Sequence, residues 1–319
     1  MKLFLTGASG LVGSNLLRLA TEHYAYEVFA SLNRRVLEPK PGLSSARLDL
    51  SSRDEVLASV AEVKPDAIIH MAFFNDLKLA YEQKDAAWKV MVDSTKNLLE
   101  AAQRLDIPML FVSSDWVFDG TQGIATEATS PNPLNYYGVL KVVGETLVTA
   151  YAKGIVARIA GVYGVNWAQG GRVLSQNLGF GNIPLLTLEY LKRGDRLGIW
   201  MYGNALNLRA TPSLASDACD MMLNLIEKGA QGIFHCVGAD HADRLEYAKA
   251  SARAFGLNPK QIEAVAVDPK TMDLPSHAGI PADTRLDAKL TSKTLGRPLL
   301  GLDAGLAVFR KQLETGVLV

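Results

Sequence analysis

The sequence has few cysteines and no excess of charge of either sign. Its 319 residues contain only two cysteines, Cys219 and Cys236. That number is too small for a disulfide framework, and the spacing is not that of a metal site, so we interpret both as small apolar residues in a reducing compartment. Basic and acidic residues are equal in number, 33 of each. The chain therefore lacks the electropositive field that nonspecific binding to nucleic acid requires.

Long hydrophobic runs are absent as well. The apolar stretch from Gly154 to Gly164 is short and interrupted by Arg158, whereas a membrane-spanning helix needs roughly 20 apolar residues. Near the N-terminus, the apolar run Leu3–Leu5 is too short for a signal peptide, and a glycine turn follows it at once. We expect a cytoplasmic protein with no membrane partner, whose apolar content of 48% builds an ordinary globular core.

Short apolar runs alternate with longer amphipathic stretches through the first half of the chain. The runs expected to be strands are Lys2–Thr6, Glu27–Leu32, Ala67–Met71, Met109–Ser113 and Ile155–Ile159. The stretches expected to be helices are Val12–Glu22, Arg53–Val63, Ala86–Arg104 and Tyr136–Lys153. Because parallel strands need a crossover, this alternation predicts an α/β fold with a Rossmann-type, doubly wound parallel sheet.

The alternation is lost after Gly164. The next segment is rich in glycine and has one helix candidate, Leu185–Lys192. A helix candidate at Leu214–Lys228 and the strand-like Gly232–Val237 indicate a return to the sheet, and the tail from Leu245 is expected to hold two or three helices. We therefore expect a dinucleotide-binding Rossmann domain over 1–164, joined by 205–240, and a smaller, mixed C-terminal substrate-binding lobe over 165–204 and 241–319.

A glycine-rich turn joins the first expected strand to the first expected helix. A phosphate group needs close backbone approach and unpaired N–H donors, which such a turn supplies. The spacing is GxxGxxG rather than the more familiar GxGxxG, and the alternative is an ordinary turn in which the glycines are incidental. From its position at the start of the chain we predict that the turn binds a dinucleotide diphosphate, through Gly7, Ser9, Gly10, Leu11, Val12 and Gly13.

The end of the second expected strand indicates which dinucleotide is bound. Proteins that prefer NAD usually carry an acid there, but this chain has Asn33, Arg34 and Arg35. A guanidinium can hold a 2′-phosphate with two hydrogen bonds, whereas a carboxylate would repel it. We predict a preference for NADP(H), with Arg34 as the main contact, Arg35 in reserve and Asn33 beside them. NAD(H) stays open, because both arginines are equally explained as solvated loop residues.

Two further strand ends border the expected cofactor site. Asp49 and Leu50 follow a further strand, the third of the sheet, between Glu27–Leu32 and Ala67–Met71. There they would cap the adenine pocket, unless Asp49 simply starts the next helix. His70 ends the fourth strand. We interpret it as a hydrogen-bonded residue of the strand end rather than as a catalyst.

Ser114, Tyr137 and Lys141 form a candidate catalytic group. Tyr137 and Lys141 lie four positions apart on an expected helix, so the phenol and the ammonium point into one site. The cation is expected to lower the tyrosine pKa from its ordinary value near ~10 and to ease proton exchange with a carbonyl or alcohol. Ser114 would donate to the substrate oxygen. A Tyr-xxx-Lys pair alone is a common surface pattern, but its place after a serine and a phosphate turn favours catalysis.

Three segments carry a resemblance to a known family. They are the serine segment Val112–Gly120, the tyrosine segment Asn135–Glu145 and the later Thr211–Asp217. On these segments the chain resembles the extended short-chain dehydrogenases/reductases of the NAD-dependent epimerase/dehydratase superfamily, and among them the dTDP-4-dehydrorhamnose reductase-like branch. Further matches from Arg158 to Gly296 extend the resemblance to nearly the whole chain.

The resemblance implies roles for further residues. Lys141 would also hold the nicotinamide ribose, and Ala72 and Phe73 would lie beside the cofactor. The implied substrate contacts are Asp115, Trp116, Val117 and Arg209. One departure stands out, because Met91 occupies the position where the family commonly carries an asparagine that supports a proton-relay water.

The leading hypothesis is an NADP(H)-dependent reductase of a keto group on a sugar nucleotide or similar carbonyl. One alternative is a sugar-nucleotide epimerase or dehydratase, which uses the same three residues with an NAD that is never released. A dehydratase adds an acid pair near the serine, which Asp115 alone does not supply. Another alternative is a non-catalytic reductase-like regulatory subunit, such as the one associated with methionine adenosyltransferase. The resemblance also implies a homodimer formed through the helices Ala86–Arg104 and Tyr136–Lys153.

Overall fold

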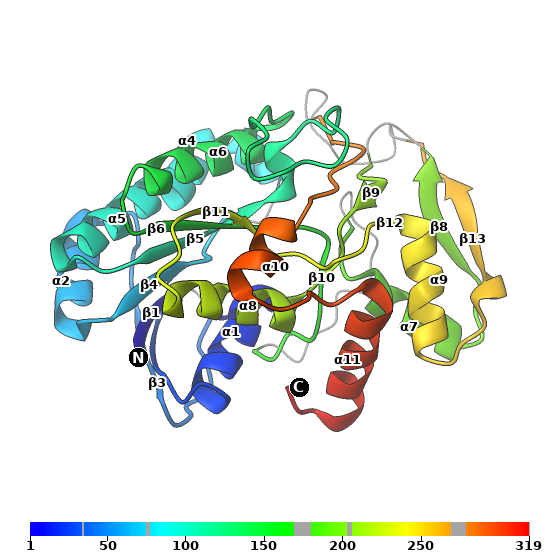
Figure 1. The fold of residues 1–319 in the computed structure, drawn as a ribbon, viewed down its shortest axis with the longest axis horizontal. Helices are drawn as coiled ribbons and strands as arrows, with labels where there is room; N and C mark the ends of the chain where they lie inside the picture. Colours follow the sequence, from blue (N-terminus) through cyan, green and yellow to red (C-terminus); the bar gives the residue numbers. More distant parts are fainter. Residues whose placement is uncertain (34, 75–76, 169–179, 203–205, 269–278, 319) are drawn as a thin grey trace.

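A seven-stranded parallel sheet forms the centre of the computed structural model, which describes residues 1–33, 35–74, 77–168, 180–202, 206–268 and 279–318 (Figure 1). From one edge to the other the strands are β11 (Gly232–His235), β6 (Gly154–Ile159), β5 (Met109–Ser114), β4 (Ala67–His70), β1 (Lys2–Thr6), β2 (Glu27–Leu32) and β3 (Leu43–Arg47). Each neighbouring pair is parallel. The strand order reverses between β1 and β4, which is where a doubly wound sheet opens its ligand crevice.

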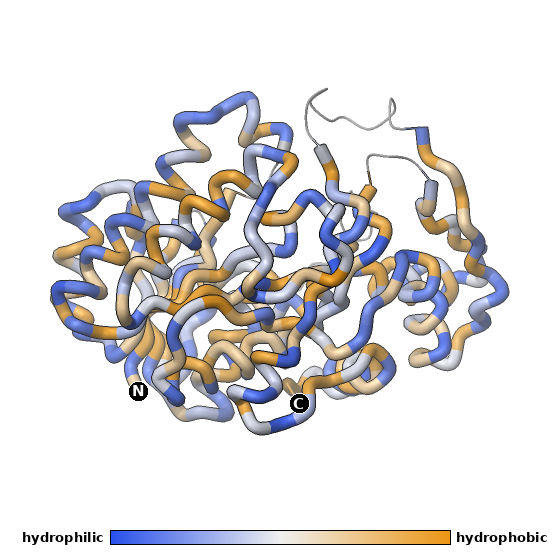
Figure 2. Tube along the Cα trace, turned by 45° about the horizontal axis from the view of Figure 1, so that its top comes forward, coloured by the Kyte–Doolittle hydropathy of each residue, from blue (hydrophilic) through white to orange (hydrophobic). Residues whose placement is uncertain are grey.

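Helices cover both faces of this sheet (Figure 1). One layer contains α1 (Leu11–Glu22) and α8 (Ala215–Glu227), which pack on each other; the other contains α2 (Arg53–Val63), α5 (Ser94–Leu105) and α6 (Tyr136–Thr149). The helices alternate between hydrophobic and hydrophilic residues along their length (Figure 2), as expected where one face is buried and the other meets water. The predicted fold class is confirmed.

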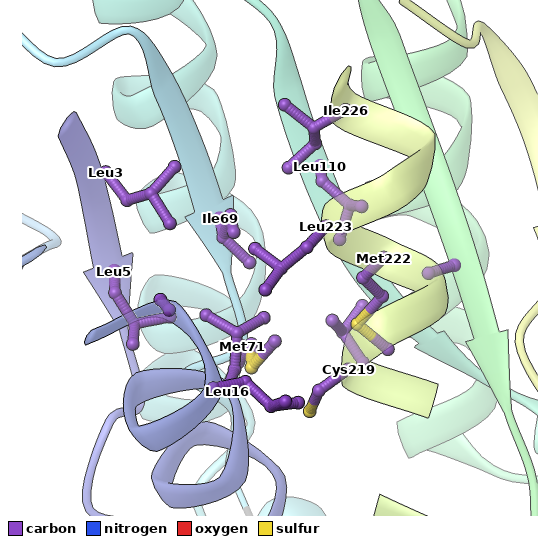
Figure 3. Packing of buried hydrophobic residues seen from close by; sticks show 14 of the residues in the cluster. Leu3, Leu5, Leu16, Ile69, Met71, Leu110, Cys219, Met222, Leu223 and Ile226 are labelled. Atoms are coloured by element: carbon purple, nitrogen blue, oxygen red, sulfur yellow. The ribbon is translucent and has the colours of Figure 1, made fainter. Parts of the chain in front are cut away.

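The alternation of side chains along β1 shows why both faces need cover. Leu3 and Leu5 point into a core shared with α1 and α8, while Phe4 between them belongs to the core under α2 and α5. In Figure 3 side chains from β1, β4, β5, α1 and α8 meet in one cluster. Successive strand residues face opposite sides of a sheet, so a strand buried on both sides is apolar throughout.

A smaller lobe packs beside the carboxyl ends of the strands (Figure 1). Its parallel pair is β8 (Leu197–Tyr202) and β13 (Ile262–Ala266), with α7 (Ile183–Lys192) and α9 (Arg244–Ala254) against it; α11 (Leu302–Thr315) packs on α9. The aromatic side chains Tyr163, Tyr247 and Phe309 pack edge to face in its core. Two short pairs join it to the rest, β7 (Val162–Tyr163) with β10 (Ser213–Leu214) and β9 (Arg209–Ala210) with β12 (Ala242–Asp243). The remaining helix here, α10 (Lys289–Leu295), packs on α8.

Several predicted elements differ from the structure. The predicted helix Ala86–Arg104 consists of α4 (Lys84–Trp88), a π-helical turn η1 (Lys89–Asp93) and α5, after a short α3 (Leu77–Glu82). The predicted helix from Tyr136 ends at Thr149, before Lys153. Strands β8 and β13 lie in the part of the chain where we predicted no strand. Among the described residues no helix has both the length and the apolar composition that a membrane crossing would need.

Candidate active site

The glycine turn after β1 is closed to side chains by the backbone that surrounds it. A Cβ on Gly13 would lie 2.1 Å from the Gly7 carbonyl oxygen, and a Cβ on Gly7 would lie 2.8 Å from the Met71 carbonyl carbon. Gly7 also has a φ of +74°, a conformation that glycine adopts at little cost. The turn therefore brings the start of α1 directly against the ends of β1 and β4.

The N-terminus of α1 has the properties of an anion site. Gly10 is its N-cap, no side chain caps it, and its first turn holds no acid. Gly10, Leu11 and Val12 are partly exposed. The first N–H groups of a helix have no partner within the helix and carry a partial positive charge, so these residues fit the diphosphate of a dinucleotide.

Ala72 and Phe73 line the other side of the same opening. The Thr6 hydroxyl accepts hydrogen bonds from the backbone N–H groups of Met71 and Ala72, both at 3.0 Å. These bonds hold the segment after β4 against the end of β1. Phe73 is 42% exposed, and its ring centre lies 6.2 Å from that of Tyr137, so it offers an apolar wall between the glycine turn and the tyrosine.

His70 lies beneath this wall as a neutral imidazole. Burial, together with the charge of Lys141, lowers the pKa of His70 to about 3. Its Nε2 lies 3.3 Å from the Ser94 hydroxyl, which itself donates to the Val90 carbonyl, and its Nδ1 lies 2.8 Å from the Thr6 hydroxyl. Ser94 Oγ must then accept from Nε2–H, and Thr6 must donate to Nδ1. The contacts agree with our interpretation of His70 as a hydrogen-bonded strand-end residue.

Ser114 stands at the carboxyl end of β5, in the same row of strand ends. Its hydroxyl donates to Asp115 Oδ1 at 2.9 Å and accepts from the Trp116 backbone N–H at 3.2 Å. The Trp116 ring meets the Tyr137 ring edge to face, with ring centres 6.2 Å apart. The serine and the tyrosine therefore border one crevice.

The start of α6 approaches this serine closely because residue 138 is glycine. A Cβ on Gly138 would lie 2.4 Å from the Trp116 carbonyl oxygen. The Asn135 side chain caps the helix by accepting from the Gly138 N–H at 2.9 Å. The cap and the glycine together place Tyr137 in the first turn of α6, facing Ser114.

Lys141 is buried one helical turn further along α6. Its ammonium donates to the Val112 carbonyl at 2.8 Å and lies 4.9 Å from the centre of the Phe111 ring and 5.7 Å from that of Tyr137. Burial lowers the pKa of Lys141 to about 7, although the nearby Glu145 carboxylate favours the charged form. The structure thus brings the amine and the phenol into one site, as their spacing predicted.

The expected effect of Lys141 on Tyr137 is wrong for this structure. Burial raises the pKa of Tyr137 above its ordinary value; a hydrogen bond with Ser114 lowers it, and the charge of Asp115 raises it further. The lysine does not counter this, since its own burial disfavours the cation. Tyr137 therefore holds its proton at neutral pH, which suits a group that donates a proton.

A buried ion pair fixes α6 on the sheet. Arg158 on β6 donates from Nε and Nη2 to the two carboxylate oxygens of Glu145, at 2.8 and 2.7 Å. Both side chains are buried, and Gly144 leaves room for the Phe111 ring, which a Cβ would approach to 2.5 Å. These two parallel hydrogen bonds fix how α6 lies along β6, and hence where Tyr137 and Lys141 lie.

The four implied substrate contacts fall into two groups. Trp116 is partly exposed beside Tyr137, and Arg209 on β9 is exposed. The Val117 side chain is fully buried next to Phe118. Asp115 is also buried, and its oxygens accept hydrogen bonds from Ser114, Asn207 and Thr284. The side chains of Asp115 and Val117 are therefore turned into the protein interior in this structure, and their contact with a substrate stays a prediction.

Three of the predicted adenosine contacts, Asn33, Asp49 and Leu50, follow the ends of β2 and β3. Asn33 is exposed, and Arg34 lies outside the described residues. Asp49 accepts from the Ser51 N–H and hydroxyl at 2.9 and 2.7 Å, in a turn just before α2. Asp49 therefore closes a turn before α2, whose N-cap is Ser52, and does not itself start that helix; its place at the adenine pocket stays a prediction. The Leu50 carbonyl accepts from Asn97 at 3.0 Å.

Met91 is buried in the π-helical turn below α6. It belongs to an apolar cluster with Leu140, against which the Tyr137 ring packs. At the position where the resemblance implies an asparagine, this chain thus has an apolar contact behind the tyrosine. Sequence reasoning did not single out Asn207 or Thr284, since neither stands in a local motif; only their shared contact with Asp115 reveals them.

Comparisons with known proteins bear on this site. A family model described as RmlD substrate binding domain matches residues 1–314. A dTDP-4-dehydrorhamnose reductase of Aggregatibacter actinomycetemcomitans is 27% identical over 309 residues, covering 92% of this chain and 93% of that protein. The methionine adenosyltransferase 2 subunit beta of Xenopus tropicalis is 27% identical over 278 residues, covering 83% and 75%. The crystal structure of a hypothetical dTDP-4-dehydrorhamnose reductase from Sulfolobus tokodaii superposes with a TM-score of 0.75 at 27% identity, covering 95% of this chain and 99% of that one.

Proposed function

Because the chain belongs to the family of the RmlD substrate binding domain, we propose that it is an NADP(H)-dependent reductase of a keto group on a sugar nucleotide or a similar carbonyl substrate. The observation that carries the proposal is the convergence of Ser114, Tyr137 and Lys141 at the strand ends, next to a glycine turn that fits a diphosphate. The similarity to dTDP-4-dehydrorhamnose reductases supports the choice of substrate class.

Each residue of this site would have its own role in a reduction. The turn from Gly7 to Gly13 would hold the diphosphate of the dinucleotide, and Lys141 its nicotinamide ribose. When bound, the nicotinamide supplies the hydride. Ser114, whose hydroxyl donates to Asp115 in this structure, would turn that hydroxyl toward the carbonyl oxygen, donate a hydrogen bond to it and so orient the carbonyl. Tyr137 would transfer its phenolic proton to the oxygen that becomes the alcohol.

The substrate class can be tested directly. We expect the purified protein to oxidise NADPH when dTDP-4-dehydrorhamnose or another 4-keto sugar nucleotide is added, measured as the loss of reduced nicotinamide absorbance. The same panel should include simple ketones without a nucleotide as a control. If only the simple ketones were turned over, the proposed sugar-nucleotide substrate would be wrong, and the protein would be a reductase of another substrate.

The cofactor preference can be tested by binding. We expect NADPH to bind about tenfold or more tightly than NADH, because charge-assisted hydrogen bonds to the 2′-phosphate add roughly 1.5–3 kcal/mol. Replacing Arg34 by Ala should weaken NADPH binding and leave NADH binding unchanged, as measured by calorimetric titration. Arg35→Ala is the matched control. Tighter binding of NADH by the unaltered protein would contradict the preference.

One specific observation favours a second candidate, a non-catalytic subunit. The chain is 27% identical both to a methionine adenosyltransferase 2 subunit beta and to the reductase, although the match to the reductase covers more of both chains. In addition, the buried Met91 stands where the resemblance implies an asparagine. This function predicts NADPH binding without turnover on any carbonyl, together with a partner that purifies with the protein. An epimerase or dehydratase would instead purify with nicotinamide already bound.

We also propose which part of the chain binds which ligand, and how two copies of the chain assemble. The Rossmann part over 1–164, completed by 205–240, would bind the dinucleotide, and 165–204 with 241–319 would bind the substrate. A homodimer formed through α5 and α6 is supported by the family membership and by the exposed apolar residues Trp88 on α4 and Val139 on α6. Sedimentation velocity tests the assembly.

A further inference from the structure

Asp115 is a buried carboxylate held by residues from three distant parts of the chain. Its Oδ1 accepts from the Ser114 hydroxyl at 2.9 Å. Its Oδ2 accepts from the Thr284 hydroxyl and from the Asn207 amide at 3.4 Å. Asn207 also donates to Thr284 Oγ1 at 2.8 Å. One oxygen thus faces the candidate catalytic serine, and the other faces the second lobe.

The two partners of Oδ2, Asn207 and Thr284, are themselves held firmly in place. Asn207 and Thr284 are each 1% exposed. The Thr284 N–H donates to the Arg209 carbonyl of β9 at 2.9 Å, and Asp283 forms a bridge to the same residue. The segment before β9 and the segment around Thr284 therefore lie side by side under Asp115 and present their donors to it together.

In the described part of the chain the carboxylate has neutral donors and no cation within ion-pair distance. A charge in such a place costs free energy that hydrogen bonds only partly offset, and an apolar side chain would fill the same space more cheaply. Burial raises the pKa of Asp115 to about 6, while the bonds from Thr284 and Ser114 lower it. A costly group of this kind, next to a candidate catalytic residue, points to a role in the site.

We propose that Asp115 is a positioning residue, which holds the Ser114 side chain in place for the substrate and makes its position depend on Thr284 of the second lobe and on Asn207 just before β9. The proposal rests on the proposed function, since it concerns the serine of that reaction. Because Thr284 and Asn207 hold Oδ2, the carboxylate plane is set and Oδ1 points at Ser114. The serine oxygen is then correctly placed only when the segment around Thr284, in the substrate lobe, is seated under the sheet.

Removal of the Thr284 hydroxyl tests the proposal from a position that does not touch Ser114. Thr284→Val keeps the shape of the side chain and removes one donor. We expect it to lower kcat about tenfold, because the carboxylate loses one of the donors that fix its plane, with little change in the Kd for NADPH. Thr291→Val is the matched control: Thr291 is equally buried in the same C-terminal part, but its hydroxyl donates to the His235 carbonyl.

A double-mutant cycle separates positioning from a general loss of packing. If Thr284 acts through Asp115 on Ser114, Thr284→Val should cost about tenfold in the unaltered protein and less than about twofold in a Ser114→Ala background. Equal losses in both backgrounds would overturn the proposal. Lack of turnover by the unaltered protein would instead count against the proposed function.

A spectroscopic readout tests the same contacts without any substrate. The infrared difference between the unaltered protein and Asp115→Asn isolates the carboxyl band of Asp115. We expect this band to shift in both Ser114→Ala and Thr284→Val and to stay in place in Thr291→Val. A band that is unchanged in Thr284→Val would show that the second lobe does not hold the carboxylate, and would overturn the proposal whatever the activity.

Discussion

Replacing Tyr137 by Phe is expected to lower kcat for a keto substrate by about 10²–10⁴-fold, the usual contribution of a positioned general acid. The phenol is the group at this crevice that holds its proton at neutral pH, because burial raises its pKa. A phenylalanine ring keeps the contacts with Phe73 and Trp116, so the fold and the Kd for NADPH should change little. Single-turnover measurement of NADPH oxidation at saturating substrate gives the rate.

The neighbouring tyrosine provides a matched control. Tyr136 lies in the same turn of α6, but its hydroxyl donates to the Lys84 carbonyl at 3.4 Å, away from Ser114. Tyr136→Phe should therefore retain kcat within about twofold. If Tyr137→Phe retained full turnover on a keto substrate, the phenol would not be the proton donor, and the proposed mechanism would be wrong.

The sequence was sufficient where a local pattern and its neighbours agree. Strand β1, the glycine turn and α1 follow one another without interruption, and each depends on residues within the same short segment. The spacing of Tyr137 and Lys141 was equally informative, because four residues make about one helical turn. These elements were predicted with nearly the bounds that the structure has.

Elements that depend on distant contacts were not predictable in the same way. The pattern of residues 86–104 predicts one amphipathic helix. In the structure this helix is interrupted by a π-helical turn that contains Met91 and packs against α6. Strands β8 and β13 pair across about 60 residues of chain, so neither has a hairpin signal beside it. Both were missed.

The direction of the Asp115 side chain is the clearest case within the site. A residue that follows a catalytic serine at a strand end is easily read as a substrate contact. Its partners Asn207 and Thr284 are 92 and 169 positions away, so no motif could indicate that the carboxylate points inward. The fold had to be known before this residue could be interpreted.

The second large effect is expected in the glycine turn, where two glycines should respond differently to the same added methyl group. A Cβ on Gly13 would lie 2.1 Å from the Gly7 oxygen and 2.7 Å from the Gly7 carbonyl carbon, both backbone atoms. A Cβ on Gly10 would meet only the Gly7 oxygen, at 3.3 Å. The φ of Gly10 is −79°, which any residue adopts.

Gly13→Ala should therefore destabilise the fold itself. Because α1 must move away from β1, we expect a loss of about 1–3 kcal/mol or more in the free energy of unfolding, typical of overpacking, and no measurable NADPH binding. Urea denaturation followed by circular dichroism gives the first quantity. A variant as stable as the unaltered protein would mean that α1 does not pack on the turn as the structure has it.

Gly10→Ala should instead leave the fold nearly intact and block the ligand. The methyl group would project beside the uncapped N-terminus of α1, where the backbone has to approach a diphosphate closely. We expect a Kd for NADPH at least about tenfold higher, with the free energy of unfolding changed by less than about 1 kcal/mol. Both come from thermal unfolding with and without NADPH, since a bound ligand raises the Tm. Unchanged NADPH affinity in Gly10→Ala would show that the diphosphate does not bind at this turn. The assignment of the N-terminus of α1 as the anion site would then be wrong.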